Sequence, residues 1–420
     1  MDDKKTYQKV ASYEVKEGVV DKVLLLYSGG LDTSVMLKWL QDTYGAKVTA
    51  LTLDIGQQSD DLEFIRKKAL KLGAEEAVVY DAKKEFAEEI LAKGIRANAS
   101  YQGEYHLSTP MGRALTAKVG VRVAQKKGIK VIAHGCTGKG NDQVRFDGYV
   151  LAFDSTMKII APVREWNMDR KEEIAYALKN KIPVPVKKDF PYSVDDNMWG
   201  MTWEGGEVEN PTSIPNVKKF LTTYTRPENA PKSGARVKIA FKNGLPTAIH
   251  GKKMLLHEII RKLNVLGGAH GVGVVYMLED RLIGLKDRGV YEQPGAHIII
   301  EAHRALERGV STRELNEIKS QLDTKWGYLC YGAKWYDPAM DALNAFNDEV
   351  NTRVEGEVTL ELYRGSVNVV AVSSPYMLGH ASFNVKEGYK YNVNASAGFI
   401  EIYSLQMKIA NEIARKKRKK

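Results

Sequence analysis

The chain has 420 residues, more than one hydrophobic core usually serves, and its 44% hydrophobic content supports packed interiors, so we expect two domains and a terminal appendage. Two cysteines are too few for a disulfide framework, and the eight histidines show no paired zinc spacing, so no structural metal is expected. The formal charge is +10, no uncharged apolar run approaches about 18 residues, and no secretory signal is visible, so we expect a soluble, cytoplasmic protein that does not cross a membrane.

Residues 1–20 are expected to form a polar extension, and from residue 22 short apolar runs alternate with amphipathic helical stretches. This alternation predicts a parallel sheet covered by helices, in an α/β domain over residues 21–183. In such sheets ligands bind at the carboxyl ends of the strands, so the loops after Tyr27, Leu53 and His134 are candidates for a site. The expected strands are Val23–Tyr27, Val48–Leu53, Ala77–Tyr80, Val131–His134 and Ile159–Val163, and helices are expected to start near Thr33, Asp61, Lys84, Met111 and Asp169.

The pattern changes after about Ile182, where prolines and clustered carboxylates begin a stretch rich in turn residues. We therefore place a domain boundary between residues 183 and 184 and expect an α+β domain over residues 184–396. Its expected elements are hairpins at Val237–His250 and Val358–Val372, a strand at His297–Ala302, and helices at Met254–Leu263, Thr312–Leu322 and Pro338–Asn351.

Residues 397–420 are expected to form a C-terminal helix that ends in a basic tail. Four apolar residues fall on one face of this helix: Ile402, Leu405, Ile409 and Ile413. That stripe can be buried on the second domain or on another subunit, and its spacing favours neither. The last six residues, Arg415–Lys420, are all basic and supply over half of the excess charge. Such a tail is most often a solvated end, and nucleic-acid binding is the less common role.

Residues 22–40 predict a buried strand, a tight loop and a helix, and the loop Ser28–Ser34 reads Ser-Gly-Gly-Leu-Asp-Thr-Ser. Adjacent glycines let the backbone turn sharply and approach a ligand, while free N–H groups and the dipole at a helix start attract phosphate. No lysine followed by serine or threonine comes after Gly30, so the loop is not of the Walker type, and a dinucleotide fingerprint lacks its third glycine. A simple capped strand-to-helix turn is the alternative.

A second glycine-rich stretch, from Ala133 to Phe146, follows another predicted strand and combines flexible backbone with amide, carboxylate and guanidinium groups. This mixture suits a zwitterionic amino acid, because an α-carboxylate is bound by a planar fork or by hydroxyl and amide donors, and an α-ammonium by a carboxylate. A surface turn with incidental charges is the alternative.

The first loop resembles the pyrophosphate loop of the ATP pyrophosphatase superfamily, whose members cleave ATP between the α and β phosphates and form adenylated intermediates. The superfamily includes argininosuccinate synthases, GMP synthetases, asparagine synthetases and tRNA-thiolating enzymes, and this loop does not distinguish them. The second stretch is similar, almost letter for letter, to the second signature of argininosuccinate synthases. Further matches run in the same order between about residues 20 and 410: Ile55–Gln57, Tyr105–Arg113, Pro191–Ser193, Asp196–Asn197, His270–Gly273, Glu279, Lys286, Arg288–Gly289 and Tyr291–Glu292.

The resemblance implies a nucleotide-binding domain of the adenine nucleotide alpha hydrolase-like type, an α+β synthetase domain and a C-terminal oligomerisation helix. It implies that ATP contacts Leu26, Tyr27, Ser28, Gly29, Gly30, Leu31, Asp32, Thr33, Ser34, Leu53 and Gly135. Aspartate would contact Thr137, Asn141 and Asp142. Citrulline would contact Tyr105, Asn141, Arg145, Ser193, Thr202, Glu279 and Tyr291, with Glu279 on its ammonium group and Arg145 on its carboxylate. No metal ligand is expected among the protein side chains.

The implied reaction joins citrulline to aspartate. ATP, supplied with Mg²⁺, adenylates the ureido oxygen of citrulline and releases pyrophosphate, after which the aspartate amine displaces AMP. No organic cofactor and no nucleic-acid partner are expected, and a homotetramer joined by C-terminal helices is implied. Pro110 stands where the family often has a hydroxyl residue and is left out of the site, whereas Cys136 is expected to pack rather than react.

Two alternative functions differ in class. A tRNA-thiolating enzyme of the same superfamily generally needs placed reactive cysteines or a metal-binding cysteine set, and Cys136 with Cys330 offers no obvious arrangement of either kind. A non-catalytic RNA-binding protein would leave the carboxylate-rich loops of the second domain without a purpose.

Overall fold

The computed structural model describes residues 7–16, 18–58, 61–138, 140–166, 168, 170–183, 191–379, 392 and 394–418. The described residues divide into two compact units, one up to Tyr376 and one from Met377 onward. The boundary predicted between residues 183 and 184 adjoins residues 184–190, which lie outside the described part of the chain. That boundary therefore stays a prediction.

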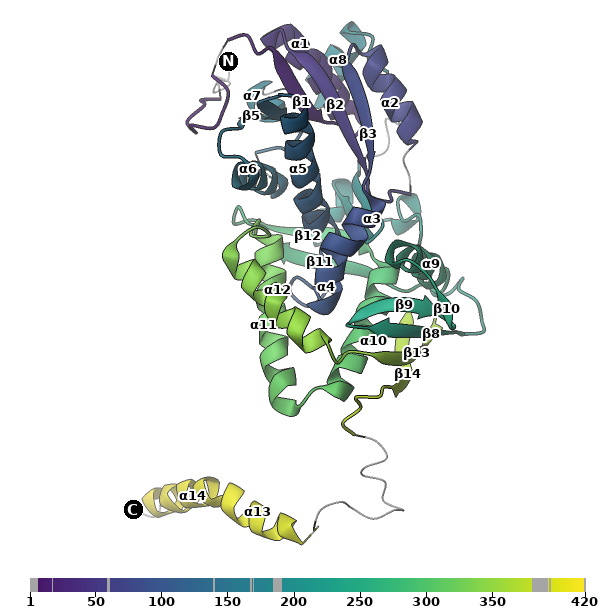
Figure 1. Ribbon diagram of the computed structural model, residues 1–420, viewed down its shortest axis with the longest axis vertical. Coiled ribbons are helices and arrows are strands. Elements are labelled where there is room, and N and C mark those ends of the chain that lie inside the picture. The colour runs from purple at the N-terminus through teal and green to yellow at the C-terminus, as the bar shows by residue number, and fades with distance from the viewer. Residues whose placement is uncertain are drawn as a thin grey trace. The chain divides into compact units, whose positions relative to one another are not determined.

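The first sheet is parallel, with its five strands in the order β3-β2-β1-β4-β5 (Figure 1). The central strand is covered on both faces: Val23 and Leu25 pack with α1 and α2, whereas Leu24 and Leu26 pack with α5. Each strand predicted in this region is confirmed to within a few residues. The strands are β1 (Lys22–Leu26), β2 (Lys47–Asp54), β3 (Glu76–Asp81), β4 (Val131–Ala133) and β5 (Lys158–Ile160).

Helices connect these strands, as the alternating pattern predicts. The helical start predicted near Asp169 lies outside the described residues, and α8 is described from Arg170. The helices of this region are α1 (Leu31–Tyr44), α2 (Leu62–Lys71), α3 (Lys83–Glu85), the π-helix η1 (Phe86–Leu91), α4 (Ala92–Arg96), α5 (Ser108–Lys126), α6 (Asp142–Phe153), α7 (Pro162–Trp166) and α8 (Arg170–Lys179).

The second region is α+β, as predicted, and contains two antiparallel sheets. One has the order β10-β9-β8-β13-β14, with strands β8 (Ala235–Lys242), β9 (Leu245–Ile249), β10 (Lys252–Lys253), β13 (Gly356–Tyr363) and β14 (Ser366–Ser373). The other has the order β11-β12-β7-β6, with strands β6 (Ser193–Asn197), β7 (Gly200–Glu204), β11 (Val274–Asp280) and β12 (Lys286–Glu292). Both predicted hairpins are confirmed by the first of these sheets. The helices are α9 (Leu256–Ala269), α10 (Pro294–Val310), α11 (Arg313–Tyr331), α12 (Pro338–Asn351) and the short 3₁₀ turns η2 (Gly206–Val208) and η3 (Val217–Lys219).

The strand predicted at His297–Ala302 is wrong, because these residues lie inside α10. The helix begins at Pro294, and the isoleucines of the run are fully buried where α10 packs on α9, β13 and β14. Ile298–Ile300 taken alone reads like a buried strand, but the polar residues His297, Glu301, Arg304 and Arg308 recur every three or four positions and are at least partly exposed, which is a helical period. Proline, which suits the first position of a helix, is a second signal that favours the helix.

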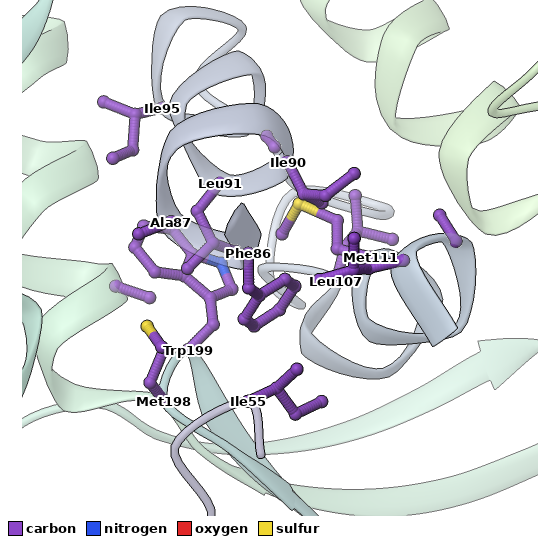
Figure 2. Close-up of a cluster of buried hydrophobic side chains, with 14 of the residues drawn as sticks. Ile55, Phe86, Ala87, Ile90, Leu91, Ile95, Leu107, Met111, Met198 and Trp199 are labelled. Carbon is purple, nitrogen blue, oxygen red and sulfur yellow. The ribbon is translucent and has the colours of Figure 1, made fainter. Parts of the chain in front are cut away.

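An apolar cluster joins the parallel sheet to the second region (Figure 2). Ile55 from the loop after β2 and Phe86 from η1 lie beside Met198 and Trp199, which form the turn between β6 and β7. The Met198 N–H donates to the Ile55 carbonyl at 3.0 Å, and the Trp199 indole donates to the His106 carbonyl at 2.7 Å. The second region therefore fixes the loop that follows β2.

The C-terminal unit contains two consecutive helices, α13 (Ala395–Tyr403) and α14 (Leu405–Arg418), where the sequence predicts one. The predicted apolar stripe is exposed in the single chain, with Ile402 77% and Ile413 62% accessible. Of the helices in the described ranges, none combines the length and apolarity needed to span a bilayer.

Candidate active site

Two loops meet where the strand order of the parallel sheet reverses, between β1 and β4. In open sheets of this kind ligands bind at the reversal, outside the carboxyl ends of the strands. The loop after β1 carries the glycine pair, and the loop after β4 carries Gly135. A Cβ atom on Gly135 would lie 2.7 Å from Met36 Cε and 3.5 Å from Thr33 Cγ2, so glycine lets the second loop lie against α1.

Hydroxyl groups brace the first loop. Ser34 donates to the Gly30 carbonyl at 2.6 Å, and its Oγ lies 3.1 Å from the Tyr27 hydroxyl. Ser28 Oγ and Thr33 Oγ1 are also 3.1 Å apart. Gly30 is the N-cap of α1 and provides no side-chain cap, so the first turn of the helix, with the positive end of the helix dipole there, suits an anion.

The other residues predicted to contact ATP lie at the same edge of the sheet. Leu26, Leu31 and Leu53 are buried, and Asp32 is exposed in the first turn of α1. The leucines offer backbone groups and apolar surface, whereas Asp32 offers a carboxylate beside the glycine pair.

The second loop is braced by a buried histidine. His134 lies 2.6 Å from Asp147 through its Nε2 atom, and its Nδ1 atom accepts from the Cys136 N–H at 3.2 Å. Burial raises the pKa of Cys136 well above its usual value, which keeps the thiol protonated. This supports packing rather than chemistry as the role of Cys136.

Asp142, at the start of α6, lies between two arginines. Arg113 Nε and Arg145 Nη1 contact its two oxygens at 2.9 and 2.7 Å. Arg113 also reaches Asp195 on β6 at 2.9 Å. Burial alone would raise the pKa of Asp142, but the two guanidinium charges outweigh it and lower that pKa to about 2. The carboxylate is therefore ionised throughout the physiological range, and Arg113 orients it.

Tyr331, at the end of α11, connects the second loop to the β11–β12 sheet. Asn141 donates to its hydroxyl at 2.8 Å, and Arg145 donates to its carbonyl through Nε at 3.2 Å and Nη2 at 2.9 Å. The ring stacks on Tyr101 with centroids 3.7 Å apart. The Leu282 N–H donates to the side-chain Oδ1 atom of Asn141 at 2.9 Å. Two of the predicted substrate residues are thus held in place: Arg145 by α11, and Asn141 by α11 and the β11–β12 turn.

Most of the residues predicted to bind citrulline cluster on the sheet that faces this loop. Tyr105 stacks on Tyr291 with centroids 4.1 Å apart, and Tyr291 is paired with Thr202 across β12 and β7. Glu279 is 4% exposed, and its Oε2 atom has no hydrogen-bond partner among the described residues. Burial raises the pKa of Glu279, against the lowering effect of hydrogen bonds from Tyr331 and Tyr291. A buried carboxylate oxygen without a donor is a strong acceptor for an ammonium group.

A further acidic group lies beside this cluster. Glu204, on β7, contacts Arg281 at 2.9 Å. Burial raises the pKa of Glu204 to about 7, and the attraction of Arg281 is opposed by the charges of Glu279, Asp142 and Asp287. The motifs assign no role to Arg113, Tyr331, Glu204 or Arg281, whose partners (Asp142, Asn141 and, for the last two, each other) lie on separate elements.

Two predicted residues stand apart from these contacts. Thr137 is exposed on the second loop, and Ser193 is exposed at the start of β6, opposite Glu204. In the described part of the chain, no hydrogen bond or ion pair joins either side chain to another predicted site residue. Across the same ranges, no three His, Cys, Asp or Glu residues are grouped closely enough to hold a metal ion.

A doubly wound parallel sheet with an uncapped glycine loop at its reversal point defines a nucleotide-binding α/β protein. The model of the arginosuccinate synthase N-terminal HUP domain matches residues 22–183, and that of the arginosuccinate synthase C-terminal domain matches residues 192–410. The chain therefore belongs to the argininosuccinate synthase family of ATP-dependent ligases, as its motifs indicate.

Argininosuccinate synthases from three organisms are similar along nearly the whole chain. That of Dictyoglomus thermophilum is 44% identical, over 92% of this chain and 96% of its own. That of Rubrobacter xylanophilus is 46% identical, over 91% and 93%, and that of Picrophilus torridus is 44% identical, over 94% and 98%. Among solved structures, the U34-tRNA thiolase NcsA of Methanococcus maripaludis with its [4Fe-4S] cluster is 17% identical, with a TM-score of 0.28 over 42% of this chain and 61% of its own.

Proposed function

We propose that the protein joins citrulline to aspartate at the expense of ATP, producing argininosuccinate, AMP and pyrophosphate, and that the clustered residues of the two loops and the β11-β12-β7-β6 sheet bind the substrates. The observation that carries the residue assignment is the buried Glu279 oxygen without a donor. The Glu279 residue lies beside Tyr331, which hydrogen-bonds both Asn141 and Arg145.

ATP is assigned to the edge of the parallel sheet. Its phosphates accept hydrogen bonds from the backbone and hydroxyl groups between Ser28 and Ser34, and its adenosine lies near Leu53 and Gly135. Mg²⁺ would accompany the phosphates, neutralising charge on the pyrophosphate, and Asp32 is the carboxylate at the loop that fits a cation carried in this way. Because both glycines border the N-terminus of α1, the helix dipole favours the same anion.

Citrulline is assigned to the opposite side of the second loop. Glu279 receives its ammonium group, Arg145 its carboxylate, and Tyr105, Thr202 and Tyr291 enclose its chain. Arg145 already bonds Asp142 and the Tyr331 carbonyl, so its orientation is set before a ligand binds. Aspartate is assigned to Thr137, Asn141 and Asp142. Ser193 completes the citrulline set at the start of β6.

The reaction proceeds in two displacement steps, one at phosphorus and one at carbon. The ureido oxygen of citrulline first forms a bond to the α phosphorus, and the bond from that phosphorus to the β-phosphate oxygen breaks, releasing pyrophosphate. The aspartate amine then attacks the ureido carbon, its proton is lost, and AMP leaves with the former ureido oxygen. The protein positions these groups and stabilises the charge that develops on the departing phosphates.

Each of the three segments of the chain is also assigned a role in this function. Residues 21–183 would bind ATP, residues 184–396 would bind the amino acids, and residues 397–420 would join four copies of the chain in the cytoplasm. Supporting this division are the two family models, which match either side of the proposed boundary, and the exposed apolar stripe of α13 and α14.

The decisive experiment measures argininosuccinate formation from citrulline, aspartate and ATP. Pyrophosphate release is expected to require citrulline and to occur once per site without aspartate. Release that instead depends on RNA and not on citrulline would contradict the proposed function and favour the thiolating alternative.

A further inference from the structure

The glycine loop has no lysine of its own, but the fold brings one to it from another helix. Lys68 lies on α2, and its Nζ atom donates a 2.8 Å hydrogen bond to the carbonyl oxygen of Gly29. The two residues are 39 positions apart, so no local motif reveals the contact.

The packing of α2 on the loop is close and specific. Gly29 has a φ of +78°, and a Cβ atom there would lie 2.6 Å from Ile65 Cγ1. Ile65 precedes Lys68 by three residues, so both side chains point from the same face of α2. The helix begins at a capping residue, Asp61, which accepts from the Phe64 N–H at 2.9 Å. The helix thus presents one apolar and one cationic side chain to Gly29.

The charge of Lys68 has no counter-ion in the described part of the chain. Lys68 is 6% exposed, and burial lowers its pKa below the usual value. The other buried lysine of that part, Lys319, contacts Glu307 at 3.4 Å and Asp323 at 2.5 Å. A buried cation without an anionic partner is costly, and the cost is removed when a bound anion supplies the missing charge.

We propose that Lys68 is the cationic partner of the phosphates held by the glycine loop, acting through the Gly29–Gly30 peptide group. The inference rests on the proposed function, because it takes that loop to be the phosphate site. In a planar trans peptide the C=O and N–H groups point in opposite directions, so a cation on the Gly29 oxygen directs the Gly30 N–H away from α2. It also polarises that N–H group as a donor. Lys68 is therefore a positioning residue for pyrophosphate binding and departure.

The test uses the full chain and magnesium pyrophosphate as the probe, with AMP as the reference ligand. Lys68→Gln keeps a donor for the Gly29 carbonyl but removes the charge, Lys68→Met removes both, and Lys68→Arg keeps the charge. Lys67→Met is the matched control, because Lys67 is the neighbouring residue of α2, is 70% exposed at its side chain and pairs with Glu63. Titration calorimetry gives both affinities, and thermal unfolding checks each fold.

The expected loss of pyrophosphate affinity is about tenfold to a hundredfold for Lys68→Met and Lys68→Gln. AMP affinity should change by less than about twofold in these two variants, because AMP carries none of the departing charge. Lys68→Arg should recover most of the pyrophosphate affinity, and Lys67→Met should match the wild type.

Three outcomes would overturn the inference: wild-type pyrophosphate affinity in Lys68→Met, wild-type affinity in Lys68→Gln, or equal losses for pyrophosphate and AMP. Wild-type affinity in Lys68→Gln would mean that Lys68 acts only as a hydrogen-bond donor. Equal losses for both ligands would mean that its role is structural only. None of these outcomes contradicts the proposed function, provided that the wild-type chain forms argininosuccinate. A wild type that fails in that assay contradicts the function whatever the lysine variants do.

Discussion

The side-chain amide of Asn141 donates a 2.8 Å hydrogen bond to the hydroxyl of Tyr331, 190 residues further along the chain. The same tyrosine accepts two bonds from Arg145 at its carbonyl, and its hydroxyl interacts with the Glu279 carboxyl group. Three residues assigned to citrulline are thus oriented by one that sequence motifs did not reveal.

Replacing Tyr331 by phenylalanine should therefore raise the KM for citrulline by about tenfold, since it removes the hydrogen bond from Asn141 and the hydroxyl group that interacts with Glu279. The KM for ATP should stay nearly constant. Tyr328→Phe is the matched control: its ring also packs on Tyr101, with centroids 5.0 Å apart, and it lies 45% exposed on the same helix. Steady-state kinetics that show no difference between the two variants would contradict the positioning role.

Glu279→Gln keeps the size of the side chain and removes its charge. If the carboxylate receives the citrulline ammonium group, the KM for citrulline should rise by about tenfold to a hundredfold while the KM for ATP is unchanged. Asp280→Asn is the control, because Asp280 is exposed and pairs with Lys286 at the surface. Equal rises for both substrates would argue against the assigned contact.

Asp32→Ala should reduce citrulline-dependent exchange of pyrophosphate into ATP to below about 1% of the wild-type rate, because it removes the carboxylate at the phosphate loop. Asp32 is exposed, so the free energy of unfolding should change by no more than about 1 kcal/mol, the size of a charge effect at a helix N-terminus. Asp42→Ala, also exposed and on α1, provides the comparison. Full turnover in Asp32→Ala would show that the reaction does not need the carboxylate at the phosphate loop.

A buried network between α4, α10 and α11 predicts a pH effect on stability. Asp323 contacts Lys319 and Asn98, with Glu307 and His303 nearby. Burial raises the pKa of Asp323 to about 7, with Glu307 raising it further and Lys319 opposing it. The folded state therefore holds a proton that the unfolded chain loses near pH 4. The stabilisation that this bound proton provides is complete below about pH 4 and is lost as the pH rises to about 7.

Urea unfolding of Asp323→Asn and of the wild type between pH 5 and 8 measures this contribution. The difference in unfolding free energy, wild type minus variant, should fall as pH rises towards 7, by at most about 1.4 kcal/mol per pH unit, and level off above it. Burial lowers the pKa of His303 to about 4, which favours folding as pH rises, but this effect is common to both proteins and cancels. A difference independent of pH would exclude the bound proton.

The proposed tetramer depends on the C-terminal helices. A chain that ends at Ala397 lacks the apolar stripe and should give a lower mass than the full chain in light scattering. A chain that ends at Ala414 loses only the basic tail and should keep the full-length mass. If both truncated chains kept the same assembly as the parent, the helices would not be the joining element.

The sequence pattern alone predicted the parallel domain well, because the signals for its strands and loops lie in neighbouring residues. A strand such as Val23–Leu26 is apolar at every position because both its faces are covered, and a glycine pair before a helix marks a turn that approaches an anion. Such signals depend on residues adjacent in the chain. The same locality explains the error at His297–Ala302, where three successive isoleucines suggest a strand in a short window and the helical spacing of His297, Glu301 and Arg304 shows only over a longer one.

The sequence by itself determined which segments form the sheet, where the glycine loops lie and to which family the motifs point. Only the tertiary structure decided that Lys68 reaches Gly29, that Arg113 and Arg145 share Asp142, and that Tyr331 holds Asn141. The physical reason is distance along the chain. Periodicity and turn chemistry act over a few residues, whereas a charge or a hydroxyl acquires its partner only when packing brings separate elements together.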